Sequence, residues 1–277
     1  MNHNIYPLAL VLVLLAVNAT SLEAEETGQA LVPLPSVLDF TRGDGWGVAL
    51  GVSVEYETAY DGSDEYELEV EPAGAVQWRK GNHLFFWEGI ELGWRSRMAD
   101  VWLLQLGARN EGGRTTDDSE DGKLDGLKDQ DDHIVGVIEV RRGFGDDWRN
   151  WVAGRLMAGE SEFGVLGVLA AGHRFGSQKD GTGTEAFLFM TFGSSTFVNK
   201  DFGVTPEESI TSGLPATDLS GGYRSTGLTL IDRRYLTNHV QFLAQAGIEY
   251  YNSEIQASPI TQKDYEVEIG ISLVYQF

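Results

Sequence analysis

Residues 264–277 read D-Y-E-V-E-I-G-I-S-L-V-Y-Q-F, and this stretch decides the fold. Aromatic and aliphatic side chains hold one set of alternate positions, while acidic, small and polar side chains hold most of the other. Because successive side chains of a β-strand point to opposite faces of the sheet, this period of two predicts a strand that is apolar on one face only.

The same alternation recurs upstream of this strand. It is clear in residues 46–57, 66–78 and 240–250, where apolar side chains share one face and Gly, Ala, Ser or Glu share most of the other. Weaker examples bring the number of predicted strands to eleven. They are residues 83–96, 101–110, 134–144, 148–158, 165–175, 185–194 and 226–236. No linker rich in Pro or Ser divides residues 46–277, so we expect one domain.

These strands predict an all-β protein, a closed antiparallel transmembrane β-barrel of ten to twelve strands, with twelve favoured. A chain in lipid must satisfy its own backbone groups, which leaves helices and closed barrels as the spanning structures. Since bacterial barrels have an even number of strands, eleven cannot be right. Either a twelfth strand lies among residues 30–45 or in the loop after Ser194, or one of the eleven segments is a loop.

The amino-terminal residues predict export. The apolar run of residues 8–17 is shorter than the roughly 20 residues that a membrane-spanning helix needs, and it is typical of a signal peptide. We expect residues 1–19 to be the signal peptide, cleaved after Ala19. Residues 20–45 should form a periplasmic segment, and residues 46–277 the barrel in the outer membrane. The absence of cysteine suits an exported protein that a closed sheet stabilises.

The chain is strongly acidic, with a formal net charge of −22. Nucleic acid is therefore excluded as a partner, because phosphate binding needs clustered Lys and Arg. The longest connections are residues 111–132, 197–223 and 252–262, and in outer-membrane barrels such loops are extracellular. The connections at residues 145–147, 177–183 and 237–239 are short and should face the periplasm. Pro206, Gly213 and Pro215 indicate that the second long loop has a fixed shape across the mouth.

Three loops carry motifs. Y-D-G-S-D-E-Y spans residues 60–66, F-G-V-T-P-E-E-S spans 202–209 with S-G-L-P-A at 212–216, and A-S-P-I spans 257–260. In this order they resemble the loop motifs of the MipA/OmpV family. The matching positions are Tyr60, Gly62, Ser63, Asp64, Tyr66, Phe202, Gly203, Val204, Pro206, Ser209, Ser212, Gly213, Leu214, Pro215, Ser258 and Pro259. The chain departs from the family at Thr217 and Asp218, where tyrosine is common, and in its longer acidic loop.

The resemblance implies a non-enzymatic scaffold of the cell envelope, without a cofactor. The member that gives the family its name brings a lytic transglycosylase together with a peptidoglycan synthase, so both enzymes are implied as partners. The alternating last strand with Tyr275 and Phe277 resembles the signal that the barrel-assembly machinery recognises. Outer-membrane lipid and lipopolysaccharide are the remaining expected partners.

The strand pattern also predicts a wall of inward-facing carboxylates where the first two strands meet the last. Its members are Glu55, Glu57, Glu67, Glu69, Glu71, Glu266 and Glu268. In an open lumen this wall would favour cations, which makes a narrow cation-preferring pore the alternative function. Otherwise these carboxylates pair with inward arginines and close the lumen. The candidate arginines are Arg95, Arg109, Arg155 and Arg174.

Metal binding and catalysis have little support in the sequence. Residues 117–122 resemble the start of a calcium loop, but Lys128 stands where such a loop requires a bidentate Glu, so we expect no metal site. An outer-membrane hydrolase is a third hypothesis, and no catalytic residue can be named for it. Outside the expected signal peptide, the histidines are His83, His133, His173 and His239, and no catalytic motif surrounds them.

Overall fold

A computed structural model describes residues 43–145, 148–175 and 182–277. The expected signal peptide at residues 1–19 and most of the expected periplasmic segment at 20–45 lie outside these residues. Among them, no helix has the length and apolar character that a membrane crossing requires. The described strands are β1 (Gly45–Thr58), β2 (Tyr66–Lys80), β3 (His83–Glu88), β4 (Glu91–Met98), β5 (Trp102–Glu111), β6 (His133–Phe144), β7 (Asn150–Ala158), β8 (Val165–Phe175), β9 (Gly183–Gly193), β10 (Gly222–Tyr235), β11 (Val240–Tyr251) and β12 (Tyr265–Gln276).

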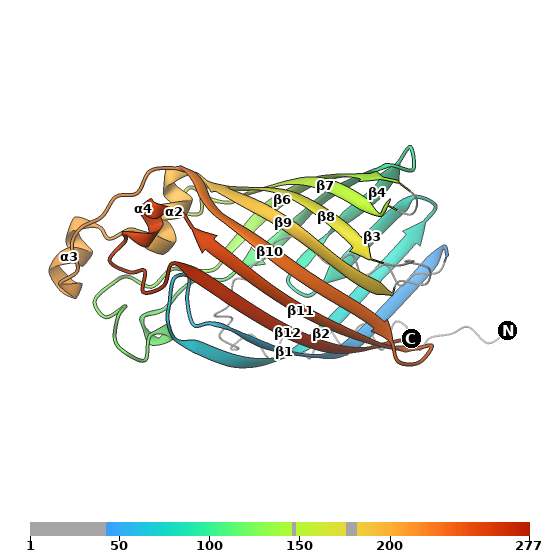
Figure 1. The fold of residues 1–277 in the computed structure, drawn as a ribbon, viewed down its shortest axis with the longest axis horizontal. Coiled ribbons are helices and arrows are strands. Elements are labelled where there is room, and N and C mark those ends of the chain that lie inside the picture. Colours follow the sequence, from blue (N-terminus) through green and yellow to red (C-terminus); the bar gives the residue numbers. More distant parts are fainter. Residues whose placement is uncertain (1–42, 146–147, 176–181) are drawn as a thin grey trace.

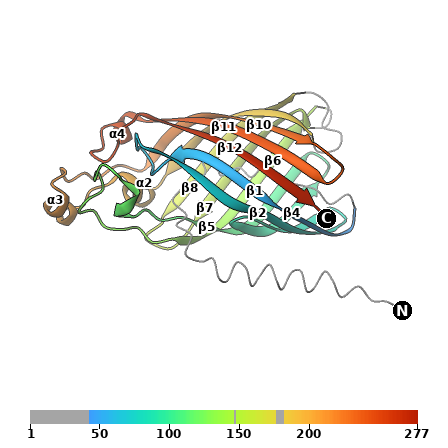
Figure 2. The same cartoon turned by 90° about the horizontal axis from the view of Figure 1, so that it is seen from below.

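These strands form one closed barrel in which each strand pairs with its sequence neighbours and β1 pairs with β12. All of the pairings are antiparallel, and Ala49 of β1 lies opposite Gln276 of β12 at the closing seam. The strands tilt around the barrel, and the longer loops gather at one end of it (Figures 1 and 2). The predicted fold class, with twelve strands, is confirmed for the described residues.

The twelfth strand lies where the sequence analysis did not place it. Residues 83–96, predicted as one strand, form both β3 and β4, which pair as a hairpin with Glu88 opposite Glu91. Gly89, at the turn, has a φ of +55°, a left-handed conformation that glycine adopts without strain. The loop after Ser194, one of the two expected places, holds helices and no named strand.

The alternation separates a lipid-facing surface from an interior. Along β12, Tyr265, Ile269, Ile271 and Leu273 are exposed, whereas Glu266 and Glu268 between them are buried. This apolar exposure is what the hydrocarbon of a bilayer requires of a barrel's outer surface. At the carboxyl end, the exposed rings of Tyr275 and Phe277 contact each other at 4.9 Å between centroids.

Helices occur in the longest connections. The β9–β10 connection contains α2 (Ser195–Phe202) and α3 (Pro206–Ser212). The β11–β12 connection contains α4 (Ser253–Gln256), and the β5–β6 connection contains the short 3₁₀ helix η1 (Thr116–Asp118). Helices α2, α3 and α4 lie at the same end of the barrel, opposite the chain's carboxyl terminus (Figure 1). Since long loops of such barrels face outward, we assign this end to the cell exterior.

An apolar cluster fills part of the lumen between β7 and β10. It comprises Trp151, Ala153, Val168, Ala170, Phe187, Phe189 and Ile231, with Leu243 packed against it. Two glycines make room for its rings, because a Cβ at Gly172 would overlap Trp151 and one at Gly227 would overlap Phe189. The glycines of the inner wall therefore allow these large aromatic side chains to pack closely against neighbouring strands.

Among the described strands, β2 pairs unequally with its two neighbours. This strand pairs with β1 over its whole length, but with β3 only from Ala75 to Lys80. The amide of Gly89 donates to the carbonyl of Gly74, so the backbone groups of Pro72, two residues earlier, face the same side. Residues 66–73 of β2 thus lie beyond the segment that pairs with β3. A proline, which has no N–H to donate, is well suited to a position beyond that pairing.

We predict that Gly172→Ala destabilises the barrel by about 1–3 kcal/mol, because the added methyl group must displace the indole of Trp151. Denaturant unfolding of the refolded protein, followed by tryptophan fluorescence, measures the change. Gly136→Ala is the matched control, since the nearest atom to its Cβ would be the Ala158 oxygen at 3.7 Å. Equal stability of the two variants would contradict the packing described for Trp151.

Candidate functional site: the capped mouth and its acidic cavity

The three motif loops, distant in sequence, meet at the extracellular mouth. Tyr60, Val204 and Ile260, one from each loop, share a buried apolar cluster. Its other buried members are Ala59, Leu124 and Leu127, and Leu214 packs against it. The sequence signal that carried the family resemblance therefore marks residues that build one structure, a cap over the barrel.

Polar contacts join the motif loops to one another. The hydroxyl of Ser258 donates to the Phe202 carbonyl at 2.6 Å, and the Tyr60 hydroxyl donates to Gln262 Oε1 at 2.5 Å. The amide of Gly62 donates to Glu266 Oε1 at 2.6 Å, and a Cβ on Gly62 would lie 3.3 Å from the Phe202 ring. Phe202 is fully buried and packs edge-on against Tyr251. These contacts hold the motif loops in one arrangement.

Helix α3, in the cap, is stabilised at both ends by its own capping residues. Pro206 occupies its first turn, and the Thr205 side chain and Glu208 form a capping box. Gly213 ends the helix with a φ of +76°. The hydroxyl of Ser209 donates to the Leu214 carbonyl at 2.6 Å, and that of Ser212 to the Glu208 carbonyl at 2.7 Å. The motif residues here therefore shape the helix ends.

The remaining motif positions divide between the interior and the surface of the cap. Ser63 is buried, and its hydroxyl accepts a hydrogen bond from the Glu65 amide at 3.0 Å. A Cβ on Gly203 would lie 2.6 Å from the Asn199 carbonyl oxygen, so the glycine permits this close approach. Tyr66 stacks on Tyr56 of β1. Asp64 and Pro215 are exposed, and Pro259 is half-buried.

The acidic β5–β6 loop is part of the same cap. The Glu65 carboxylate accepts hydrogen bonds from the amides of Glu120 and Asp121, at 2.9 and 3.0 Å. Farther along this loop, the Lys128 amide donates to Glu208 at 3.0 Å and so joins the loop to α3. Partial burial by itself raises the pKa of Glu208, but hydrogen bonds from Thr205 and Lys128 outweigh it, and the pKa is lowered.

The predicted acidic wall lies below the cap. Glu55 pairs with Glu69 across β1 and β2, and Glu57 pairs with Glu67, while Glu71 lies opposite Ser53. Glu266 and Glu268 are buried on β12, where Glu266 lies opposite Glu249 of β11. Carboxylates that face each other directly across strands repel, so this wall is a region of concentrated negative charge.

The predicted arginines pair with other glutamates. A continuous hydrogen-bonded network runs from β2 to β7, and each of its members is at least nine-tenths buried. In order, the network joins Gln77, Glu88, Arg95, Gln105, Glu91, Arg155, Glu139 and Arg141. Arg109 pairs with Glu111 and Arg174 with Glu185. The sequence analysis offered these arginines as partners of the acidic wall. In the described ion pairs, their partners are other glutamates.

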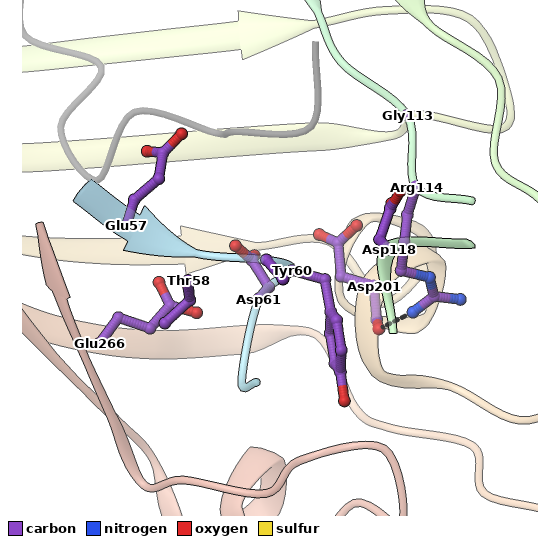
Figure 3. Close-up of a pocket in the computed structure, with 10 residues that line it drawn as sticks. Glu57, Thr58, Tyr60, Asp61, Gly113, Arg114, Asp118, Asp201 and Glu266 are labelled. Atoms are coloured by element: carbon purple, nitrogen blue, oxygen red, sulfur yellow. Dashed lines mark hydrogen bonds between the residues drawn. The ribbon is translucent and has the colours of Figure 1, made fainter. Parts of the chain in front are cut away.

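A cavity of about 30 Å³ lies between the cap and the wall. It is lined by Glu57, Thr58, Ala59, Tyr60, Asp61, Gly113, Arg114, Asp118, Asp201 and Glu266. Figure 3 shows side chains from β1, β12, α2 and the β5–β6 loop around it. Arg114 donates to the Asp201 carbonyl at 2.6 Å, which fixes the loop against α2. Within the described chain, no three His, Asp or Glu side chains are already arranged as a metal site.

The family model for MltA-interacting protein MipA matches residues 50–277. The chain belongs to the MipA family. Comparison with curated proteins finds no match. Among solved structures, an outer membrane channel from Pseudomonas putida F1 is similar with a TM-score of 0.50 and 10% identity, over 84% of this chain and 96% of the channel. The toluene transporter TodX from Pseudomonas putida has a TM-score of 0.42 and 8% identity, over 84% and 89% of the two chains.

The family assignment and the fold make this chain an outer-membrane β-barrel protein. At 10% identity, the likeness to the channel is a likeness of fold alone. The loop motifs through which this chain resembles the family contribute residues to the cap.

The sequence analysis missed the ion pairs that brace the cap of this MipA-family barrel. Arg224 of β10 binds both Asp61 and Glu249, and lies against the rings of Phe202 and Tyr251. Arg224 lies in the irregularity where the β9–β10 register shifts, between Tyr223 and Ser225. Both Arg224 and Ser225 are buried there, so alternation could not identify them. Asp61 was within the motif but at one of its variable positions.

We predict that the cap loosens in acid. The pKa of Glu208 lies below the usual 4.5, so its carboxylate stabilises the folded cap above that value, and this contribution is lost as the pH falls through the lowered pKa. The Ser119 hydroxyl and the Lys123 amide likewise lower the pKa of Asp121. Hydrogen exchange of α3, corrected for its intrinsic pH dependence, should rise below about pH 4.5.

Two substitutions test the assignment to Glu208. Glu208→Gln should remove most of this pH dependence, because the amide has no proton to take up. Glu207→Gln should leave the dependence intact, since Glu207 is exposed in the same turn. A pH profile that is the same in both variants would exclude Glu208 as the titrating group.

Proposed function

We propose that this protein is a non-enzymatic scaffold of the outer membrane, which holds peptidoglycan-processing enzymes at the periplasmic end of its barrel. The observation that carries the proposal is the number of large side chains that the barrel wall and the cap hold inside the barrel. An apolar cluster lies on the side formed by β7 to β10, a buried Arg–Glu network lies on the side formed by β2 to β7, and a folded cap lies at one end. We infer that these side chains close the lumen, and a closed barrel offers its surfaces, and not its interior, to partners.

The family supplies the class of partner. Its description is MltA-interacting protein. The motif resemblance implies that a lytic transglycosylase and a peptidoglycan synthase are brought together, and both act in the periplasm. We therefore infer that the binding surface lies at the end with the short turns.

The charges of the described residues favour a binding surface at the periplasmic end, where the short turns lie. Lys80, Arg97, Arg149 and Arg234 are exposed there, and Arg142 stacks on Trp102 and Phe144 nearby. The opposite, capped end carries most of the exposed acids of the loops. A partner with an acidic surface would be attracted to the periplasmic end and repelled from the other.

A narrow cation-preferring pore is the second candidate, and the acidic wall favours it. Glu55, Glu69 and Glu71 are only half-buried, so the wall retains access to solvent. A hydrolase has less support, because the histidines lie in separate contacts. His133 packs on Phe163, His173 contacts Asn150 and His239 contacts the Gln276 carbonyl.

We predict that the folded protein gives no discrete conductance steps in a planar bilayer, because we expect the inward aromatic rings and the Arg–Glu network to close the lumen. A difference in gel mobility between unheated and boiled protein confirms that the sample is folded. Cation-selective steps that shrink in Glu69→Gln would instead establish the pore and contradict a closed barrel.

We predict that the purified barrel binds a lytic transglycosylase of its own envelope, more weakly at high salt. The double reversal Lys80→Glu with Arg149→Glu should weaken binding by roughly tenfold or more, because charges at an interface steer association. Lys128→Glu, on the capped end, is the matched control and should bind like the wild type. Equal loss in both variants would place the interface elsewhere, and no binding by the wild type would refute the scaffold.

A further inference from the structure

One arginine on the lipid-facing surface has no carboxylate partner among the described residues. Arg142 of β6 lies opposite Trp102 of β5 and Val152 of β7. Its neighbour Arg141 is buried in the lumen, where it binds Glu139. Because successive side chains of a strand point to opposite faces, Arg142 is directed outward, and it is exposed. No ion pair or side-chain hydrogen bond joins it to any described residue.

The position of Arg142 along β6 places it at the level of lipid headgroups. It is two residues from Phe144, where the strand ends at a short periplasmic turn. The rings of Trp102 and Phe144 are 38% and 39% exposed, and aromatic side chains form girdles at the membrane interfaces of such barrels. An outward arginine is costly at the middle of the bilayer and is tolerated near the interface. The periplasmic leaflet of an outer membrane consists of phospholipids, so the anions nearest to Arg142 are their phosphates.

The two aromatic rings hold the guanidinium of Arg142 in place. Its Cζ lies 5.2 Å from the centroid of the Trp102 ring and 4.9 Å from that of the Phe144 ring. A guanidinium that is already fixed loses little freedom on binding, and its fork of donors matches two oxygens of a phosphate. Val140 and Val152, 40% and 45% exposed on the same outward face, offer apolar surface for the acyl chains.

Hydrogen bonds between two periplasmic turns support this part of the wall. The amide of Gly143 donates to the Val101 carbonyl at 2.8 Å, and the indole Nε1 of Trp148 donates to the Asp100 carbonyl at 2.7 Å. The indole packs over Gly143, where a Cβ would overlap it. These contacts fix the ends of β5 and β6, which carry the two stacking rings.

The outward-facing arginine of β10 is the opposite case. Arg234 lies near the short β10–β11 turn, on the face that carries the exposed side chains of Leu228 and Leu230. Its Nε donates to Oδ2 of Asp232 at 2.8 Å, and its Nη2 donates to Oδ1 of the same carboxylate at 2.9 Å. The charge of Arg234 is therefore neutralised within the protein, whereas that of Arg142 is left for an anion outside it.

We propose that Arg142, Trp102 and Phe144 form a binding site for the phosphate of one phospholipid of the periplasmic leaflet. Because Arg142 brings a positive charge without a described partner, the site prefers a lipid with a net negative charge, such as phosphatidylglycerol, over a zwitterionic one, such as phosphatidylcholine. One basic residue near a bilayer surface accounts for roughly a fivefold difference in affinity. The proposal does not depend on the scaffold function.

Native mass spectrometry of the full, folded protein in detergent micelles measures how tightly lipid is retained. With phosphatidylglycerol and phosphatidylcholine of identical acyl chains, the wild type should retain one phosphatidylglycerol roughly fivefold more tightly. Arg142→Gln should abolish this preference, because the amide carries no charge. Arg234→Gln is the matched control and should keep the wild-type preference. Glycerol phosphate, a headgroup without acyl chains, should not displace the lipid.

Four results would overturn the proposal. They are equal retention of the two lipids by the wild type, an unchanged preference in Arg142→Gln, an equal loss of preference in Arg234→Gln, and displacement of the lipid by an equal concentration of glycerol phosphate. If Arg142→Gln does not give a heat-modifiable, folded barrel, Trp102→Leu replaces it. That change removes one stacking ring and keeps an apolar outward surface, so the preference should fall, and an unchanged preference would count equally against the site.

Discussion

Pairing of β1 with β12 is the constraint on which the rest of the structure depends. Hydrocarbon offers no hydrogen bonds, so a sheet can cross it only if its first and last strands meet. The pairing from Ala49 opposite Gln276 to Tyr56 opposite Ile269 achieves this closure. Once the sheet is closed, every second side chain is directed into a confined lumen, and the chemistry of those inward residues determines what the barrel can do.

The inward residues divide the lumen by chemistry. Aromatic rings that glycines accommodate fill the side formed by β7 to β10. A network in which Arg155 joins Glu91 and Glu139 occupies the side formed by β2 to β7. Buried ion pairs of this kind add less stability than their Coulomb energy indicates, because both partners lose their hydration. Their effect here is to fix the positions of inward side chains on strands that are not neighbours.

The sequence predicted the fold well because barrel strands follow one simple rule, and it failed where that rule is interrupted. Leu84, Phe85, Phe86 and Trp87 form an unbroken apolar run, so the turn at Gly89 and the extra strand that it creates were not recognised. Arg224 was missed because the irregularity beside Tyr223 places two consecutive residues inside.

The cap was only partly predictable for a different reason. Its motifs could be matched in the sequence, but which loops touch depends on contacts between residues far apart in the chain. Arg114 reaches the carbonyl of Asp201, 87 positions later, and Asp61 reaches Arg224, 163 positions later. Neither local periodicity nor loop length contains that information.

The short β3–β4 hairpin affects how the protein sits in its membrane. Above Gly74, β2 lies beyond the segment that pairs with β3, and Leu68 and Val70 there are each 66% exposed. Hydrocarbon offers no hydrogen bonds to a strand, so we expect the lipid tails on this side to end near the top of the hairpin, where pairing between β2 and β3 ends. On the opposite side, pairing between β9 and β10 continues to Gly193. We therefore expect the bilayer to meet the barrel at unequal heights, with a thinner layer of lipid beside β3 and β4 than across the barrel.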